Sequence, residues 1–169
     1  MKRLHQIVLG LFILVMALPV WAETLPLASD LQQDGVASKR DGTPIMVFYM
    51  SEDCPYCEEV KGLYLEPMVR SGQYHGRLII RMVDTEGAEY LRDFHGKRMN
   101  HEEFADDQGA SFTPVLKFYD YQGNELVPEL LGYTSPDFYL AYLENAIETS
   151  INKLCPRTKT AQVKIKPVF

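Results

Sequence analysis

The chain has 169 residues, a formal net charge of −6, 46% hydrophobic residues and 24% charged residues. This length fits a single domain with a core of its own. The acidic balance opposes binding to nucleic acid or to anionic membrane surfaces, so proteins are the expected partners.

The first 22 residues have the layout of a secretory signal peptide. Lys2 and Arg3 precede an apolar segment over 7–18, and Val20-Trp21-Ala22 lies where a signal peptidase would cut. The apolar segment is shorter than the roughly 20 residues that a membrane-spanning helix needs. We therefore expect export and cleavage after Ala22, with an uncleaved N-terminal anchor as the alternative.

Cleavage would leave one domain over residues 23–155 and a basic C-terminal extension over 156–169. The leader holds two basic residues and no acidic one, so 15 basic and 23 acidic residues would remain, a net charge of −8. The extension has few apolar residues to bury, and it is either loose or packed onto the body of the domain.

Two elements are expected before the cysteines. The polar stretch 23–42 has leucines at near-helical spacing and a stop at Asp41-Gly42, which predicts a short helix. Residues 45–50 form an unbroken apolar run, which is typical of a strand covered on both faces.

A Cys-x-x-Cys motif follows that strand. Cys54, Pro55, Tyr56 and Cys57 come after three polar residues, and Pro55 suits the first turn of a helix. A helix N-terminus favours an anionic sulfur, so Cys54 is the expected nucleophile and Cys57 can reach back to form a disulfide. A disulfide that closes so small a loop adds little stability, so a redox role is favoured over a structural one.

The helix that begins at Pro55 should run to about Ser71 and kink at Pro67. Apolar residues that recur every three or four positions predict its buried face: Val60, Leu63, Tyr64, Pro67 and Met68.

The middle of the chain predicts a strand and an insertion. Residues 77–84 read as a central strand. The charged stretch 85–111 is too long for a plain connection, and Asn100 followed by Glu103 predicts a capped helix to about Gly109.

The last part of the chain predicts two strands and a helix. Residues 115–119 and 125–131 flank a turn at 121–124, which indicates a hairpin. Ser135 and Pro136 are suited to begin the final helix. Its predicted sheet-facing stripe consists of Phe138, Tyr139, Tyr142, Leu143 and Ile147. The order of elements predicts an α/β fold with a mixed sheet of about four strands and helices on both faces.

These motifs together resemble the thioredoxin superfamily. The strand, the Cys-x-x-Cys helix and the later Phe112-Thr113-Pro114 carry the likeness. Further segments narrow it to exported thiol oxidoreductases of the SoxW type: Phe94-His95-Gly96-Lys97, Tyr121-Gln122-Gly123-Asn124-Glu125 and Gly132-Tyr133-Thr134-Ser135-Pro136-Asp137-Phe138-Tyr139. The resemblance covers roughly residues 45–147 and implies a thioredoxin-like fold.

The resemblance also implies roles for single residues. Pro114 would be a cis-proline facing the cysteines, and Thr113 beside it would contact an extended substrate peptide. Tyr56 would shade the sulfurs or contact substrate, although it is equally explained as an exposed aromatic. Two positions depart from thioredoxins: Phe48 replaces a buried aspartate, and Asp53 replaces a tryptophan.

The implied activity is periplasmic thiol-disulfide exchange, with reduction of protein disulfides as the preferred direction and a membrane thiol-electron donor for re-reduction. An oxidant or isomerase, or a non-catalytic binding module with the same fold, are the alternatives. Cys-Pro-Tyr-Cys also occurs in glutaredoxins, but no glycine pair with a carboxylate follows Pro114 to hold glutathione. No cofactor is expected.

The spacing of Cys155 and the histidines does not indicate a metal site. Cys155 is expected to be a free thiol near the C-terminus, with pairing to another chain as the alternative. A zinc site would need Cys155 or some of His75, His95 and His101, which lack the spacing of metal ligands. The histidines are expected at the surface.

Overall fold

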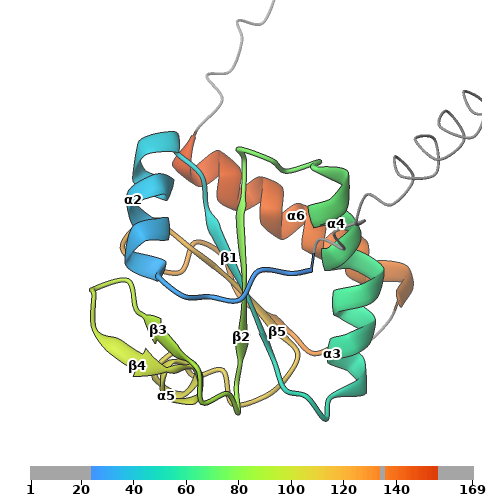
Figure 1. The fold of residues 1–169 in the computed structure, drawn as a ribbon. Helices are drawn as coiled ribbons and strands as arrows, with labels where there is room; N and C mark the ends of the chain where they lie inside the picture. Colours follow the sequence, from blue (N-terminus) through green and yellow to red (C-terminus); the bar gives the residue numbers. More distant parts are fainter. Residues whose placement is uncertain (1–23, 134–135, 156–169) are drawn as a thin grey trace, which may run out of the picture.

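The computed structural model describes residues 24–133 and 136–155, and the central feature of this part is a mixed four-stranded sheet (Figure 1). Its strand order is β2-β1-β5-β6, in which β1 pairs with β2 in parallel, while the β1–β5 and β5–β6 pairs are antiparallel. The strands are β1 (Ile45–Met50), β2 (Ile79–Asp84), β5 (Val115–Tyr119) and β6 (Leu130–Leu131). The predicted α/β architecture with helices on both faces is confirmed.

Helices cover both faces of the sheet (Figure 1). One face carries α3 (Pro55–Val60), η1 (Lys61–Leu65), α4 (Glu66–Ser71) and α6 (Pro136–Leu154), and the other carries α2 (Leu31–Asp41) and α5 (His101–Asp107). Side chains of β1 alternate between two apolar clusters, with Phe48 in the first and Tyr49 in the second. All six residues of β1 are buried, as predicted from their unbroken apolar run.

The strand predicted over 77–84 lies at an edge of this sheet rather than at its centre. It begins at Ile79, and its outer side meets the segment that precedes α2. The Ala28 N–H donates to the Met82 carbonyl at 2.8 Å, and the Met82 N–H donates to the Pro26 carbonyl at 2.9 Å. These bonds satisfy the edge without a further regular strand.

The helix after the cysteines is not a uniform α-helix. A five-residue π-helical stretch, η1, lies directly before α4, and the second residue of α4 is Pro67, whose missing N–H cannot join the regular α-helical pattern. The wider turn changes which residues point inward. Leu63, predicted to be buried, is 60% exposed, whereas Leu65 is fully buried.

The insertion between β2 and β5 contains a hairpin that the sequence analysis did not predict. Strands β3 (Tyr90–Arg92) and β4 (Arg98–Asn100) pair in an antiparallel sheet of their own. The predicted helix cap at Asn100 is confirmed, because its side chain accepts from the Glu103 N–H at 2.7 Å and Glu103 accepts from the Asn100 N–H.

The strand predicted over 125–131 is largely wrong. The predicted turn is present, with a hydrogen bond from the Asp120 N–H to the Asn124 carbonyl. After an isolated bridge at Glu125, however, pairing with β5 resumes only at Leu130–Leu131. Pro128 lies between them and has no N–H to donate to a ladder.

The predicted buried stripe of α6 is right for three of its five residues. Tyr139, Leu143 and Ile147 are buried, whereas Phe138 and Tyr142 are each 62% exposed. The helix packs through 139, 143, 146, 147, 150 and 151, so the two aromatics lie just outside that face.

Other predictions concern residues outside the described part of the chain: the leader over 1–22, the Ser135 cap and the extension over 156–169. Within 24–133 and 136–155, no helix has both the length and the apolar character needed to cross a membrane.

A close backbone approach fixes α2 against the turn after β5, and it makes a testable prediction. A Cβ added to Gly35 would lie 2.6 Å from the Tyr121 carbonyl oxygen, whereas one added to Gly62 in η1 would meet no atom within 4 Å. We expect Gly35→Ala to lower the free energy of unfolding by about 1–3 kcal/mol, because backbone must move. The matched Gly62→Ala should be neutral or stabilising by up to about 1 kcal/mol. Urea denaturation of both variants checks this, and equal effects would contradict it.

Candidate functional site

The site is built where β1 ends and α3 begins. Cys54 is the N-cap of α3, and Pro55 occupies the first turn, as predicted. The sulfur atoms of Cys54 and Cys57 are joined in a disulfide, with their Cα atoms 5.2 Å apart. The protein is therefore described in its oxidised state.

The two cysteines differ in their access to solvent. Cys54 retains 9% of its surface exposed, whereas Cys57 is fully buried. The Cys57 N–H lies 3.1 Å from the Cys54 sulfur, at the positive end of the α3 dipole. After reduction, this N–H would stabilise a thiolate on Cys54, so Cys54 is the sulfur placed to react with another molecule.

Pro114, the predicted cis-proline, lies at the end of the sheet where β1 leads into the cysteines. The Thr113–Pro114 peptide bond is cis and leads directly into β5. Ser51 joins the two halves of the site: its carbonyl accepts from the Cys54 N–H at 3.4 Å, and its hydroxyl lies 3.2 Å from the Thr113 hydroxyl. The structure thus brings Thr113 and the cysteine loop together.

Pairing with β6 leaves the backbone of Thr113 available. The Pro114 carbonyl accepts from the Gly132 N–H at 2.8 Å. Within the described part of the chain, the backbone N–H and C=O of Thr113 have no hydrogen-bond partner. These are the groups with which an extended peptide could pair.

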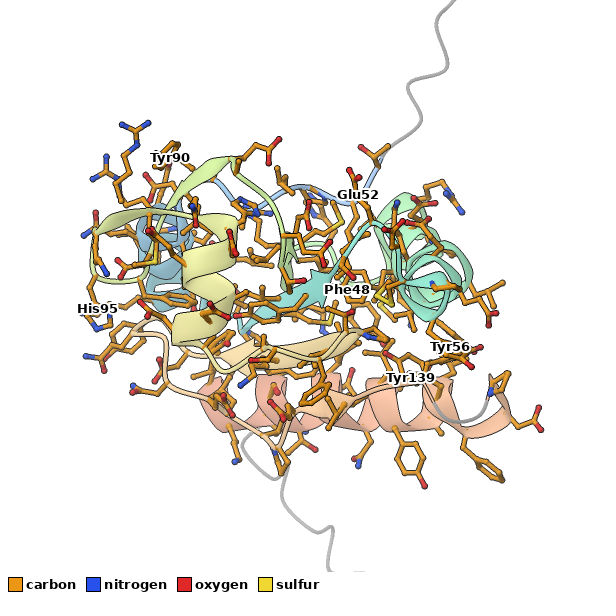
Figure 2. The ribbon with its side chains drawn as sticks, turned by 90° about the horizontal axis from the view of Figure 1, so that it is seen from below. Phe48, Glu52, Tyr56, Tyr90, His95 and Tyr139 are labelled. Carbon is orange, nitrogen blue, oxygen red and sulfur yellow. A yellow bond between two sulfur atoms is a disulfide. The ribbon has the colours of Figure 1, made fainter. Side chains whose placement is uncertain are left out.

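A group of four tyrosines lies beside the disulfide: Tyr56, Tyr64, Tyr133 and Tyr139. Tyr56 is 57% exposed and its ring centroid is 6.2 Å from that of Tyr133. Tyr133 in turn contacts Tyr64 and Tyr139, at 6.1 and 5.1 Å. Figure 2 shows Tyr56 and Tyr139 on the same side of the molecule. Tyr56 alone was predicted as a site residue, because the other three tyrosines come together only when η1, the segment after β6 and α6 pack against one another.

Hydroxyl groups connect this tyrosine group in a defined direction. Tyr64 donates to the Pro136 carbonyl, so the Tyr133 hydroxyl, 3.3 Å from that of Tyr64, is the donor between the two. This hydrogen bond, with burial and the nearby Glu59, raises the pKa of Tyr133 to about 12. Tyr133 is therefore a neutral phenol at physiological pH and can only donate or accept a hydrogen bond there.

Exposed carboxylates precede and follow the cysteines in the chain. Glu52 and Asp53 precede Cys54 and are exposed. Glu58 is paired with Lys61 at 3.2 Å. Phe48, at the position where thioredoxins have a buried aspartate, is fully buried in apolar surroundings. β1 therefore places no titratable side chain at that position beneath the sulfurs.

His101 corrects the prediction that the histidines lie at the surface. It is fully buried, whereas His75 and His95 are exposed. Its Nδ1 accepts from the Asp84 N–H at 3.2 Å, and its Nε2 lies 2.8 Å from the Ala28 carbonyl oxygen. The ring is thus a neutral tautomer with Nε2–H as donor, and it ties β2 to the segment before α2.

Lys117 is a second buried polar group that the sequence analysis missed. Its ammonium group bonds to the Gln108 carbonyl and to the carboxylates of Glu125 and Glu129, at 2.8–2.9 Å. Burial by itself lowers the pKa of Lys117, but the two carboxylates outweigh it and the net shift is upward. A lysine within a strand gives no sequence signal that distinguishes it from an exposed one.

Cys155 is a free and exposed cysteine. Its Cβ lies beside Gly42, which precedes β1, whereas Cys54 follows β1. The strand between them spans about 20 Å, so Cys155 is not brought to the disulfide. Within 24–133 and 136–155, no group of three His, Cys, Asp or Glu side chains is arranged to bind a metal ion.

Comparison with known proteins follows this geometry. Residues 31–147 match the family described as a thioredoxin-like domain. No curated protein matches the chain. Among solved structures, thioredoxin O2 from Arabidopsis thaliana is 16% identical, with 75% of this chain and 93% of that chain covered and a TM-score of 0.49. A thioredoxin-fold protein from Helicobacter pylori is 18% identical, with 71% and 85% covered and a TM-score of 0.49.

Proposed function

Because the chain belongs to the family of thioredoxin-like domains, we propose that it is an exported thiol-disulfide oxidoreductase that reduces disulfides in other proteins. The observation that carries this proposal is the Cys54–Cys57 disulfide at the N-terminus of α3, with Cys54 the less buried of the two cysteines. The structure and the family match establish a thioredoxin-like fold with a cysteine pair close enough for dithiol-disulfide exchange.

The proposed reaction has two steps of thiol-disulfide exchange. The Cys54 thiolate attacks one sulfur of a substrate disulfide, which forms a mixed disulfide and releases the other substrate sulfur as a thiolate. The Cys57 thiolate then attacks the Cys54 sulfur and releases the second substrate sulfur. The substrate gains two electrons and two protons, and the protein ends in the disulfide form that the structure contains.

The site supports a polypeptide as the substrate. An extended chain can pair with the free backbone groups of Thr113, held by the cis-Pro114 turn. Tyr56 is the exposed aromatic beside the disulfide and would contact that chain. The roles of Thr113 and Pro114 are those implied by the family resemblance.

The reducing direction is supported by the charges around Cys54. Strong oxidants of this fold owe their potential to a stabilised thiolate in the reduced form. Glu52 and Asp53 oppose a thiolate on Cys54 and so favour the disulfide form, which makes the dithiol a better reductant. The leader layout of residues 1–22 and the SoxW-type segments support a periplasmic location, with a membrane thiol-electron donor as the source of electrons.

Trapping the mixed disulfide tests this function. In Cys57→Ala, the second step cannot occur, so covalent adducts with substrate proteins should accumulate at Cys54. The background should carry Cys155→Ser, because Cys155 is exposed and would form adducts of its own. Non-reducing gels and mass spectrometry of periplasmic extracts identify the adducts, and the further Cys54→Ala variant is the control. A lack of adducts that depend on Cys54 would favour the non-catalytic binding module.

Equilibration with glutathione separates the two catalytic alternatives. A reductant should have a Cys54–Cys57 potential near that of thioredoxin, about −270 mV, whereas an oxidant or isomerase should lie nearer −120 to −180 mV. A value in the second range would overturn the proposed direction.

A further inference from the structure

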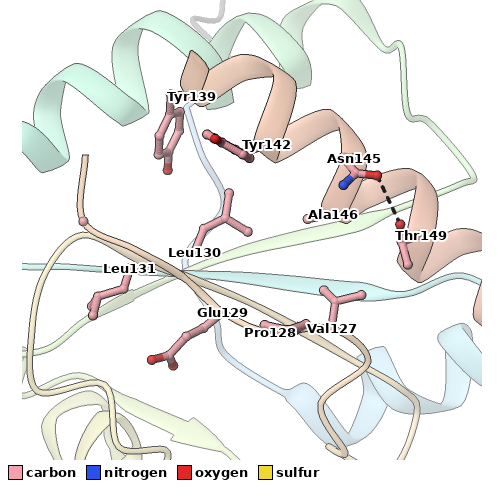
Figure 3. A pocket seen from close by; sticks show the side chains of 11 residues that line it. Val127, Pro128, Glu129, Leu130, Leu131, Tyr139, Tyr142, Asn145, Ala146 and Thr149 are labelled. Atoms are coloured by element: carbon pink, nitrogen blue, oxygen red, sulfur yellow. Dashed lines mark hydrogen bonds between the residues drawn. The ribbon is translucent and has the colours of Figure 1, made fainter. Parts of the chain in front are cut away.

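A groove runs along the outer side of β6, between that segment and α6 (Figure 3). Its volume is about 410 Å³. The walls are mainly apolar: Val127, Leu130 and Gly132 on one side, Tyr139 and Ala146 on the other. The aromatic ring of Tyr142, also on the wall, is 62% exposed. The groove is thus an apolar surface that the described part of the chain leaves open.

Among the described residues, no further strand pairs with the outer edge of β6, the strand beside the groove. In the antiparallel pairing with β5, Gly132 donates to Pro114 and Leu130 lies opposite Leu116. Hydrogen-bonded and non-bonded pairs alternate in such a ladder. The N–H and C=O groups of Glu129 and Leu131 therefore point away from β5, toward the side on which a further strand could be added.

The two faces of this edge differ in chemistry. Leu130 points toward α6, while the side chains of Glu129 and Leu131 point to the opposite face (Figure 3). On that opposite face, Glu125 and Glu129 share the single ammonium group of Lys117 and remain 44% and 38% exposed. Two carboxylates and one cation leave a local excess of one negative charge. An added strand would fit best with apolar side chains toward α6 and basic side chains on the other face.

The chain itself carries such a segment. Val163, Lys164, Ile165 and Lys166 alternate apolar and basic residues with the period of a strand, and Pro167 would end the pairing. We propose that this segment adds to the open edge of β6, with Val163 and Ile165 in the groove and the two lysines facing Glu125 and Glu129.

The end of α6 lies where this docking requires it. The Lys153 ammonium group donates to the Leu126 carbonyl, so the last turn of α6 contacts the chain just before Val127 at the start of the groove. From Tyr139 to Thr149, the groove extends about 15 Å along the helix. Val163 follows Cys155 by eight positions, and an extended chain of eight residue steps reaches about 26 Å. The segment can therefore enter the groove without any change in the domain.

Amide hydrogen exchange on the full-length oxidised protein tests the proposal. The Leu131 amide and the amides of 163–166 should be protected, and Val163→Asp with Ile165→Asp should speed exchange at Leu131 by about tenfold or more. Thr158→Asp with Thr160→Asp places the same charges just before the docking segment and should leave Leu131 protected. The Phe48 amide in β1 serves as a reference that should not change in either variant.

Three outcomes would overturn the proposal. The first is equal exchange at Leu131 in the wild type and in the Val163→Asp, Ile165→Asp variant. The second is protection that grows with protein concentration together with a doubled mass, which would assign the edge to a second copy. The third is protection that occurs only after a disulfide-containing polypeptide is added, which would assign the groove to substrate.

Discussion

Cys54→Ser should lower the rate of protein disulfide reduction by about a thousandfold or more. A serine hydroxyl is not ionised near neutral pH, so the position that the Cys57 N–H and the start of α3 prepare for a thiolate would hold no nucleophile. Cys57 cannot take over, because its sulfur is fully buried. The measurement is the reduction of a protein disulfide with dithiothreitol as the terminal reductant.

The third cysteine provides the matched control for this experiment. Cys155→Ser makes the same chemical change at a cysteine that lies near the opposite end of β1 from Cys54. It should leave the rate of disulfide reduction unchanged. If Cys54→Ser retained activity, or if Cys155→Ser lost it, the assignment of Cys54 as the nucleophile would be wrong.

His101→Ala should reduce the free energy of unfolding by about 3–5 kcal/mol. The substitution removes a fully buried ring, leaves a cavity, and removes the hydrogen-bond partners of the Asp84 N–H and the Ala28 carbonyl. Both groups belong to segments that meet only through tertiary contacts, so the outer edge of β2 should loosen. Chemical denaturation gives the difference in stability.

His95→Ala is the control, since His95 is exposed in the turn between β3 and β4 and its loss should change stability by less than about 0.5 kcal/mol. His101→Gln keeps a polar side chain of similar length and should cost less than His101→Ala. A loss below about 1 kcal/mol in His101→Ala would show that the buried ring contributes little to holding these segments together.

Local chemistry made several elements predictable from the sequence. β1 was recognisable because six consecutive apolar residues require cover on both faces. The start of α3 followed from Pro55 after a cysteine, and the cap of α5 followed from Asn100 and Glu103, because capping acts between residues three apart. The α/β architecture followed in turn from the order of the elements.

Errors arose where a residue's environment depends on distant segments. Leu63 and Tyr142 have the spacing of buried residues, but the π-helical turn before Pro67 and the packing angle of α6 leave them exposed. The hairpin of β3 and β4 was missed because its strands are only three residues long and their pairing gives little periodic signal.

Cys54 and Cys57 could be assigned as the reacting pair from the sequence, since their three-residue spacing and the proline between them are local features that specify both a helix start and a disulfide. The surroundings of that pair depend on how distant segments pack. Tyr64, Tyr133 and Tyr139 meet beside Tyr56 although they lie on segments far apart in the chain. The burial of His101 and Lys117 could not be predicted for the same reason. Whether a single side chain is buried depends on its contacts with distant segments, and the residue type and its spacing in the sequence do not specify those contacts.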